Sequence, residues 1–133
     1  MGVDPILRSV VTNSLTSISR KMGESMLRSS RSPIFAEARD FVTAVFDRPL
    51  RLVAQTPYIP VLIGSTPVAL KSIAGHFNDT VTEGDVFILN DPYWGNNHPP
   101  DVTVVRPVFH RGVLRFWAFT RGHQTDIGGG AGG

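Results

Sequence analysis

Residues 98–126 read HPPDVTVVRPVFHRGVLRFWAFTRGHQTD, and this stretch decides the fold. It contains two apolar runs rich in β-branched residues, 102–109 and 113–120, on either side of the turn residues His110, Arg111 and Gly112. Two such runs around a short turn with glycine predict an antiparallel β-hairpin. The hairpin would bring the residues before its first strand and after its second strand to the same open end.

Two His-x-x-Asp pairs flank this hairpin, His98 with Asp101 and His123 with Asp126. The chain has no cysteine, so a metal would have to be held by imidazole and carboxylate groups. On the hairpin geometry, His98, Asp101 and His123 can meet around one cation. Asp126 would then be a fourth ligand or a group that orients the ligands. The spacing also permits a cluster of hydrogen-bonded loop side chains, and this alternative stays open here.

Negative charge and polar side chains gather next to the first pair. Residues 81–101 include four carboxylates and no lysine or arginine, which makes this stretch a reasonable place to expect a cation. Within it, segment 90–100 holds three prolines, three asparagines and one glycine, a composition typical of a loop with rigid corners. Its amides and aromatic rings could position a polar substrate, although a turn with side-chain caps explains the same residues.

The other two histidines are expected to be structural. His76 lies near the end of a predicted helix, and His110 lies in the hairpin turn. His110 has no carboxylate or second histidine at the spacing of metal ligands. A single surface or capping imidazole is common, so neither is assigned to a site.

The N-terminal segment predicts one long helix. Asp4 can cap it, and Pro5 suits the first position, where a missing N–H costs nothing. It should end between Arg28 and Ser32, because Pro33 disfavours a helical residue before it. Apolar residues recur at steps of three and four, and we expect this stripe to face the core. The stripe consists of Ile6, Leu7, Val10, Val11, Leu15, Ile18, Met22 and Met26.

The middle of the chain predicts strands and a second helix. Residues 41–46 and 50–55 indicate a hairpin, and 58–63 is at best a short edge strand because prolines interrupt it. Helical spacing covers 66–76, and a strand follows over 86–89. Together with the C-terminal hairpin, these elements predict an α+β fold. A long helix and a shorter helix would pack on a mainly antiparallel sheet of about five strands.

Size and composition exclude several classes of protein. The 133 residues suffice for one modest domain, and we treat 1–133 as a single unit. Charged residues make up 18%, and hydrophobic residues 41%, which excludes a disordered tail and a coiled coil. The net charge of +2 gives nucleic-acid binding little support. No apolar run approaches the roughly 20 residues of a membrane span, and no signal-like segment is seen, so we expect a cytoplasmic protein.

Several blocks resemble the hydantoinase B/oxoprolinase group, which includes 5-oxoprolinase, N-methylhydantoinase B subunits and the catalytic subunits of acetone and acetophenone carboxylases. The resemblance runs from the first helix to the last residue, and the later blocks are specific in order and spacing. The blocks are residues 31–41 (RSPIFAEARDF), 46–47 (FD), 52–55 (LVAQ), 84–93 (GDVFILNDPY), 98–102 (HPPDV) and 122–129 (GHQTDIGG).

The resemblance implies a divalent metal, manganese or zinc, bound by His98, Asp101 and His123. It also implies that the chain is the N-terminal part of a longer subunit, truncated in the glycine-rich loop after His123. A hydantoinase A-like partner would bind and hydrolyse ATP and phosphorylate the substrate carbonyl. Two positions depart from the group: Leu62 and Gln124 stand where members often have histidine. Neither departure removes a proposed ligand.

The leading hypothesis is therefore a metal-dependent catalytic subunit that opens cyclic amides, such as hydantoins or 5-oxoproline, with an ATP-hydrolysing partner. We assign substrate binding to Asn90, Tyr93 and Arg121, and proton transfer from a metal-bound water to Asp126 or Asp91. Two alternatives remain. One is a ketone carboxylase of the acetone carboxylase type with the same ligands, and the other is a non-catalytic, truncated interaction module.

Overall fold

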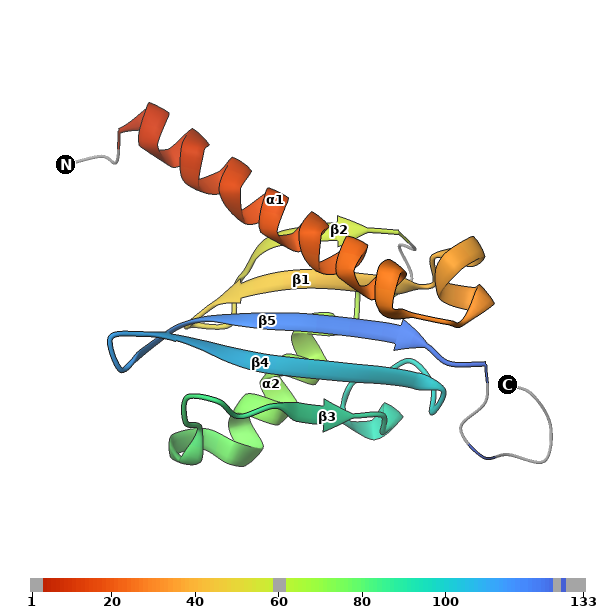
Figure 1. Cartoon of the computed structure of the whole chain (residues 1–133). Helices are drawn as coiled ribbons and strands as arrows, with labels where there is room; N and C mark the ends of the chain where they lie inside the picture. Colours follow the sequence, from red (N-terminus) through yellow and green to blue (C-terminus); the bar gives the residue numbers. More distant parts are fainter. Residues whose placement is uncertain (1–3, 59–61, 126–127, 129–133) are drawn as a thin grey trace.

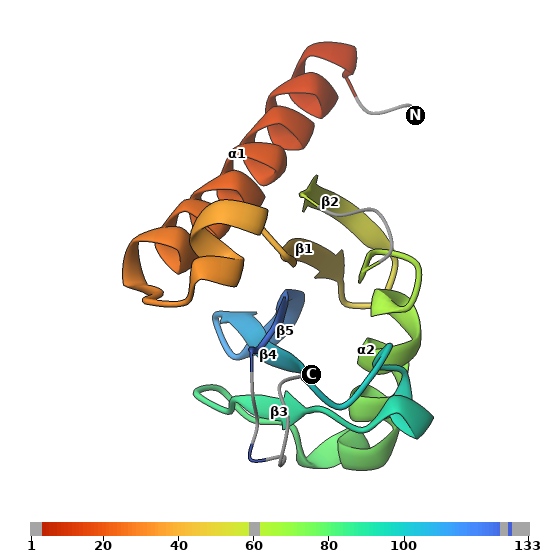
Figure 2. The same ribbon diagram turned by 90° about the vertical axis from the view of Figure 1, so that its right-hand side faces the viewer.

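The structure is a computed structural model that describes residues 4–58, 62–125 and 128. Within these residues, five strands form one antiparallel sheet in the order β2-β1-β5-β4-β3, with a helix on each face (Figures 1 and 2). The predicted α+β fold, with a long and a shorter helix on five strands, is confirmed. The elements are α1 (Pro5–Ser29), β1 (Phe41–Asp47), β2 (Leu52–Pro57), α2 (Thr66–Phe77), β3 (Phe87–Leu89), β4 (Asp101–His110) and β5 (Val113–His123).

The hairpin of β4 and β5 has the longest pairing in the sheet. Its two-residue turn places Arg111 at φ 53° and Gly112 at φ 72°, the left-handed conformations that suit the right-handed twist of the strands. Both strands run further toward the open end than the sequence pattern predicted. The ladder therefore includes Asp101 and His123, which lie directly opposite each other.

Alternation along the central strands builds the core between the sheet and α2. Apolar side chains two residues apart point to the same face of a strand, so every second residue of β1 and β5 faces α2. This face is filled by Val42, Ala44, Phe46, Val105, Trp117 and Phe119 from the sheet and by Ala69, Leu70 and Ile73 from α2. All six residues from Phe41 to Phe46 are buried, because α1 covers the other face of β1.

The prediction that the apolar stripe of α1 faces the core is wrong for the first half of the helix and for Ile18, which is also exposed. Ile6 and Leu7 are 74% and 55% exposed, and Val10 and Val11 are also exposed, because this half extends past the edge of the sheet (Figure 1). The second half packs closely through small residues instead. A Cβ added at Gly23 would lie 2.8 Å from the Tyr58 hydroxyl, so only glycine allows this approach.

Three hydroxyl groups join α1 to the sheet. The buried Ser19 hydroxyl lies 3.0 Å from the carbonyl oxygen of Thr43, 3.2 Å from its hydroxyl and 3.0 Å from the Thr56 hydroxyl. The Thr43 hydroxyl in turn donates to the Ser19 carbonyl oxygen at 2.8 Å. This cluster fixes the position of the helix along β1 and β2.

Ser19→Ala is expected to lower the free energy of unfolding by about 1–2 kcal/mol, because buried hydroxyl groups of the two threonines lose a partner. Urea denaturation measures the change. Ser17→Ala, on the exposed side of the same helix, is the control and should be neutral or slightly stabilising. Equal changes in the two variants would show that the hydroxyl cluster does not hold α1.

Three local predictions differ from the structure. Leu50 has φ 65° and belongs to the turn, so β2 begins at Leu52 and runs to Pro57. The predicted edge strand over 58–63 is not a strand at its described ends: Tyr58 lies in a bend, Leu62 is helical and Ile63 lies in a turn, and 59–61 lie outside the described residues. A short π-helical turn, η1 (Ile34–Ala38), was not predicted.

Among the helices of the described residues, none is long and apolar enough to span a membrane.

Candidate metal centre

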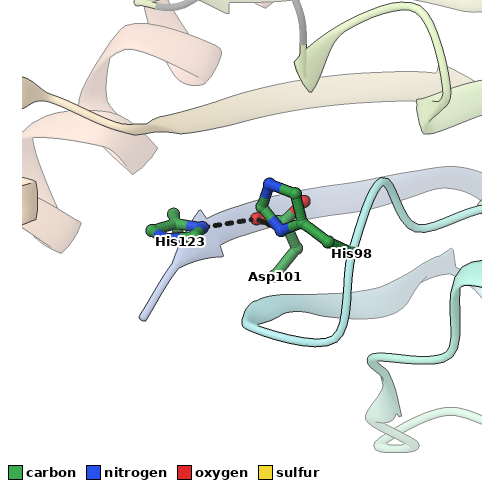
Figure 3. Close-up of side chains that lie close together, drawn as sticks. All are labelled: His98, Asp101 and His123. Atoms are coloured by element: carbon green, nitrogen blue, oxygen red, sulfur yellow. Dashed lines mark hydrogen bonds and ion pairs between the residues drawn. The ribbon is translucent and has the colours of Figure 1, made fainter. Parts of the chain in front are cut away.

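Three side chains converge at the open end of the β4–β5 hairpin (Figure 3). One carboxylate oxygen of Asp101, Oδ1, lies 3.2 Å from Nδ1 of His98 and 3.1 Å from Nδ1 of His123. The two imidazole rings stand nearly perpendicular, at 82°, with their centroids 4.8 Å apart. One ligand atom from each residue falls within 4.8 Å of the other two, so the sequence-predicted trio is brought together.

The sheet holds two of these side chains and a loop holds the third. Asp101 and His123 face each other across the ladder, on the face of the sheet that carries the α2 core. The β5 end is tied to β1 because the His123 amide donates to the Asp40 carbonyl oxygen at 3.0 Å. His98 precedes β4, and its carbonyl oxygen accepts from the Asp101 amide at 3.1 Å, which closes the turn over the two prolines.

The geometry fits a divalent cation. Asp101 has no exposed surface, and its second oxygen, Oδ2, is buried without a hydrogen-bond partner among the described residues. A buried carboxylate oxygen of this kind is costly unless a cation or a donor meets it. Two ligands that each lie about 2.1 Å from one cation are about 3.0–3.4 Å apart, and the separations of 3.2 Å and 3.1 Å between Asp101 Oδ1 and the two histidines fall in this range. Two imidazoles and one carboxylate suit manganese or zinc and leave coordination positions open.

Exposure of the cluster is graded. The side chain of Asp101 is fully buried, that of His123 is 15% exposed, and that of His98 is 50% exposed. Asp101 therefore forms the floor of the centre and His98 its solvent side. A small molecule would approach past His98.

Arg121, which the sequence assigned to substrate binding, lies inside the protein. Its side chain has no exposed surface, and it donates to the Thr103 hydroxyl at 2.8 Å and to the Gly95 carbonyl oxygen at 3.0 Å. Burial lowers the pKa of Arg121 to about 10, and the Asp101 carboxylate opposes this change. The guanidinium therefore stays charged at neutral pH, behind the cluster rather than in contact with solvent.

The loop residues of the predicted site make hydrogen bonds within their own segment. The Asp91 carboxylate accepts from the Tyr93 amide at 2.9 Å and so caps the short turn η4 (Pro92–Trp94). Asp91 lines a hollow beside Ile88 and Leu89 of β3. The Asn90 amide donates to the Pro99 carbonyl oxygen at 3.4 Å, and the Tyr93 side chain is 99% exposed.

The remaining positions discussed from the sequence do not belong to the described cluster. Asp126 lies outside the described residues, as does most of the glycine-rich tail, so its assigned role stays a prediction. The His76 ring packs edge-on against Trp94 with centroids 5.1 Å apart, and His110 ends β4 far along the strand from Asp101. Leu62 is buried in the core.

Sequence reasoning missed the buried polar residues next to the cluster. The Asn96 amide donates to the carbonyl oxygens of Asp101 at 2.6 Å and Leu89 at 3.1 Å, and its amide oxygen accepts from Thr103 at 2.8 Å. Asn96 is only 6% exposed. The available signal was Thr103, which lies on the same face of β4 as Val105. A hydroxyl group buried there needs a hydrogen-bond partner.

Comparison with known proteins places the chain among enzymes of one group. The family model described as hydantoinase B/oxoprolinase matches residues 4–133. The chain is 41% identical over 127 residues to the caprolactamase subunit beta of Pseudomonas jessenii. The aligned region covers 96% of this chain and 22% of the relative. It is 39% identical to the 5-oxoprolinase of Dictyostelium discoideum over 96% of this chain and 10% of the relative.

Solved structures agree with these matches. The crystal structure of ATP-dependent caprolactamase from Pseudomonas jessenii superposes with a TM-score of 0.90 at 40% identity, over 98% of this chain and 23% of that chain. The nucleotide-free structure of acetone carboxylase superposes with a TM-score of 0.85 at 25% identity, over 94% of this chain and 17% of that chain. The chain thus spans less than a quarter of the relatives it matches.

Proposed function

The chain belongs to the hydantoinase B/oxoprolinase family, and on this premise we propose that it is the N-terminal part of a metal-dependent catalytic subunit that opens cyclic amides with an ATP-hydrolysing, hydantoinase A-like partner. The observation that carries the proposal is the cluster of His98, Asp101 and His123, with a buried carboxylate oxygen that has no hydrogen-bond partner among the described residues. A hydrogen-bonded cluster without metal would leave that oxygen unsatisfied.

Similarity favours cyclic amides over ketones as the substrate class. The relatives named caprolactamase and 5-oxoprolinase act, by their names, on cyclic amides, and they are 41% and 39% identical to this chain. Acetone carboxylase has the same fold at 25% identity. Hydantoins, 5-oxoproline and lactams are therefore the first compounds to test, and ATP-dependent ketone carboxylation is the second candidate.

The exposure of Asp101 and His98 indicates the role proposed for each residue. A bound divalent metal would polarise the activated carbonyl and lower the pKa of a bound water. Asp101 supplies a buried negative charge beneath the ion, and the half-exposed His98 borders the side that a substrate reaches. Asp126 or Asp91 would accept the proton of the water, and Asn90 and Tyr93 would contact the substrate from the loop. A cytoplasmic location stays a prediction.

The first test is metal content. After dialysis of the 133-residue chain against manganese or zinc, elemental analysis is expected to find close to one ion per chain. His98→Ala should lose it, because two ligands alone bind weakly. His110→Ala, at the other end of β4, is the control and should keep the ion. A folded chain without metal would mean that the cluster is structural or that required ligands lie elsewhere in the subunit.

The second test is activity of the complete subunit with its partner. ATP-dependent release of a ring-opened acid from a hydantoin, 5-oxoproline or caprolactam would support the amide reaction. ATP-dependent uptake of labelled bicarbonate with a ketone would support the carboxylase instead. Absence of both reactions across the panel, with metal bound and partner present, would favour a non-catalytic interaction module.

A further inference from the structure

One buried arginine reaches the loop that carries His98 by several routes. Arg121 donates directly to the Gly95 carbonyl oxygen through Nη2, at 3.0 Å. Its Nε donates to the Thr103 hydroxyl at 2.8 Å, and that hydroxyl donates to the Asn96 amide oxygen at 2.8 Å. Two consecutive loop residues are thus tied to one side chain of β5.

A third route runs through α2. Nη1 of Arg121 donates to the hydroxyl of Ser65, the residue before α2, and this hydroxyl donates to the Asn97 amide oxygen. The three nitrogen atoms of one guanidinium therefore reach residues 95, 96 and 97, immediately before His98, one directly and two through a hydroxyl group. Arg121 and Thr103 are fully buried, so water does not replace these bonds.

The proposed ligands in the strands and the proposed ligand in the loop are held in place by different interactions. Asp101 and His123 belong to the ladder of β4 and β5, which fixes them through backbone hydrogen bonds. His98 lies outside the ladder, and the position of its imidazole depends on the loop. A metal centre needs each ligand within a fraction of an ångström of its place, so the support of a loop ligand affects affinity directly.

We propose that Arg121 is a positioning residue for this centre: it fixes residues 95–97 and thereby sets His98 against Asp101. This inference rests on the proposed function. It replaces the direct contact with substrate that the sequence suggested for Arg121. The buried guanidinium has three specific acceptors and no route to solvent, which is the arrangement of a structural hub rather than of a substrate ligand.

The test compares manganese affinity among variants. Isothermal titration calorimetry with MnCl₂ on the 133-residue chain should show at least tenfold weaker binding in Arg121→Met, since loss of support around metal ligands typically costs about 10–100-fold. Arg121→Lys, which keeps the charge and can reach one acceptor, should fall between Arg121→Met and wild type. Arg115→Met, an exposed arginine of the same strand, is the control and should match wild type.

Amide hydrogen exchange separates positioning from general destabilisation. In metal-free Arg121→Met, the amides of residues 95 and 96, which donate within the loop, should exchange at least tenfold faster. The amide of Phe119, in the centre of β5, should keep its rate. Equal acceleration at both places, or unchanged manganese affinity, would overturn the proposal.

A milder variant covers the case in which Arg121→Met does not fold. Ser65→Ala removes only the branch to Asn97 and should weaken manganese binding about threefold by the same reasoning. Unchanged affinity in Ser65→Ala together with unchanged exchange of the loop would overturn the positioning role. If wild type itself binds no manganese or zinc, this chain does not form the centre and the positioning role fails with it, whereas the proposed function is then decided by the activity of the complete subunit. If wild type binds and the variants bind equally well, only the role of Arg121 fails.

Discussion

Asp101→Asn is expected to abolish stabilisation of the chain by divalent metal. A ligand at about 1,000 times its dissociation constant stabilises the folded state by about 4 kcal/mol, which raises the melting temperature of a chain of this size by about 15 °C. The variant keeps the shape of the side chain but removes the buried charge on which the centre is built. Thermal unfolding with and without manganese or zinc measures the effect.

Without metal, the same substitution should also lower the melting temperature, because the Asp101 carboxylate offsets part of the cost of burying the charged Arg121. The quantity to compare is therefore the rise in melting temperature that metal produces in each variant. Glu83→Gln is the control, because it removes an exposed carboxylate from the same acidic segment. Its melting temperature should rise with metal as in wild type. An equal rise in Asp101→Asn would mean that the metal binds elsewhere.

The convergence of the three ligands could be predicted because it follows from local signals. Alternating apolar residues and a glycine-containing turn specify the hairpin within about 20 neighbouring residues, and the hairpin alone brings Asp101 opposite His123. His98 then follows from its distance of three residues from Asp101. Each step depends on residues close in sequence, where pattern and structure are tightly linked.

The support of the centre could not be predicted, because it joins segments far apart in sequence. Arg121 bonds to Ser65, 56 residues away, and to Gly95, 26 residues away. Nothing in the local pattern of β5 distinguishes a buried arginine from one that contacts a substrate. The prediction that the apolar face of α1 is buried was wrong for a related reason. Periodicity shows which residues share a face of the helix. Burial of Ile6 and Leu7 depends on whether the sheet extends far enough to cover them (Figure 1).

Gly95→Ala is expected to lower the free energy of unfolding by about 3–5 kcal/mol, from two causes. Gly95 has φ +105°, a conformation that costs an alanine about 1–2 kcal/mol. A Cβ at this position would also lie 2.5 Å from the amide nitrogen of Ala69 and 2.9 Å from the carbonyl carbon of Val68. These atoms belong to the first turn of α2, whose Ala69 amide is bonded to Ser65, so they cannot move freely.

Gly84→Ala separates the two causes. Gly84 has φ +100°, but nothing lies within 4 Å of an added Cβ, so this variant carries the backbone cost alone and should lose only about 1–2 kcal/mol. Urea denaturation of both variants gives the difference. Equal losses would mean that the loop does not press against α2 as the structure has it.

The consequence of Gly95→Ala should extend to the metal centre. Relief of the clash moves the loop away from α2, which breaks the bond from Arg121 to the Gly95 carbonyl oxygen and displaces His98, three residues further on. Manganese affinity should therefore fall in Gly95→Ala under conditions in which the chain remains folded, and should stay unchanged in Gly84→Ala. A destabilised Gly95→Ala that binds manganese as tightly as wild type would show that His98 is positioned independently of the loop before it.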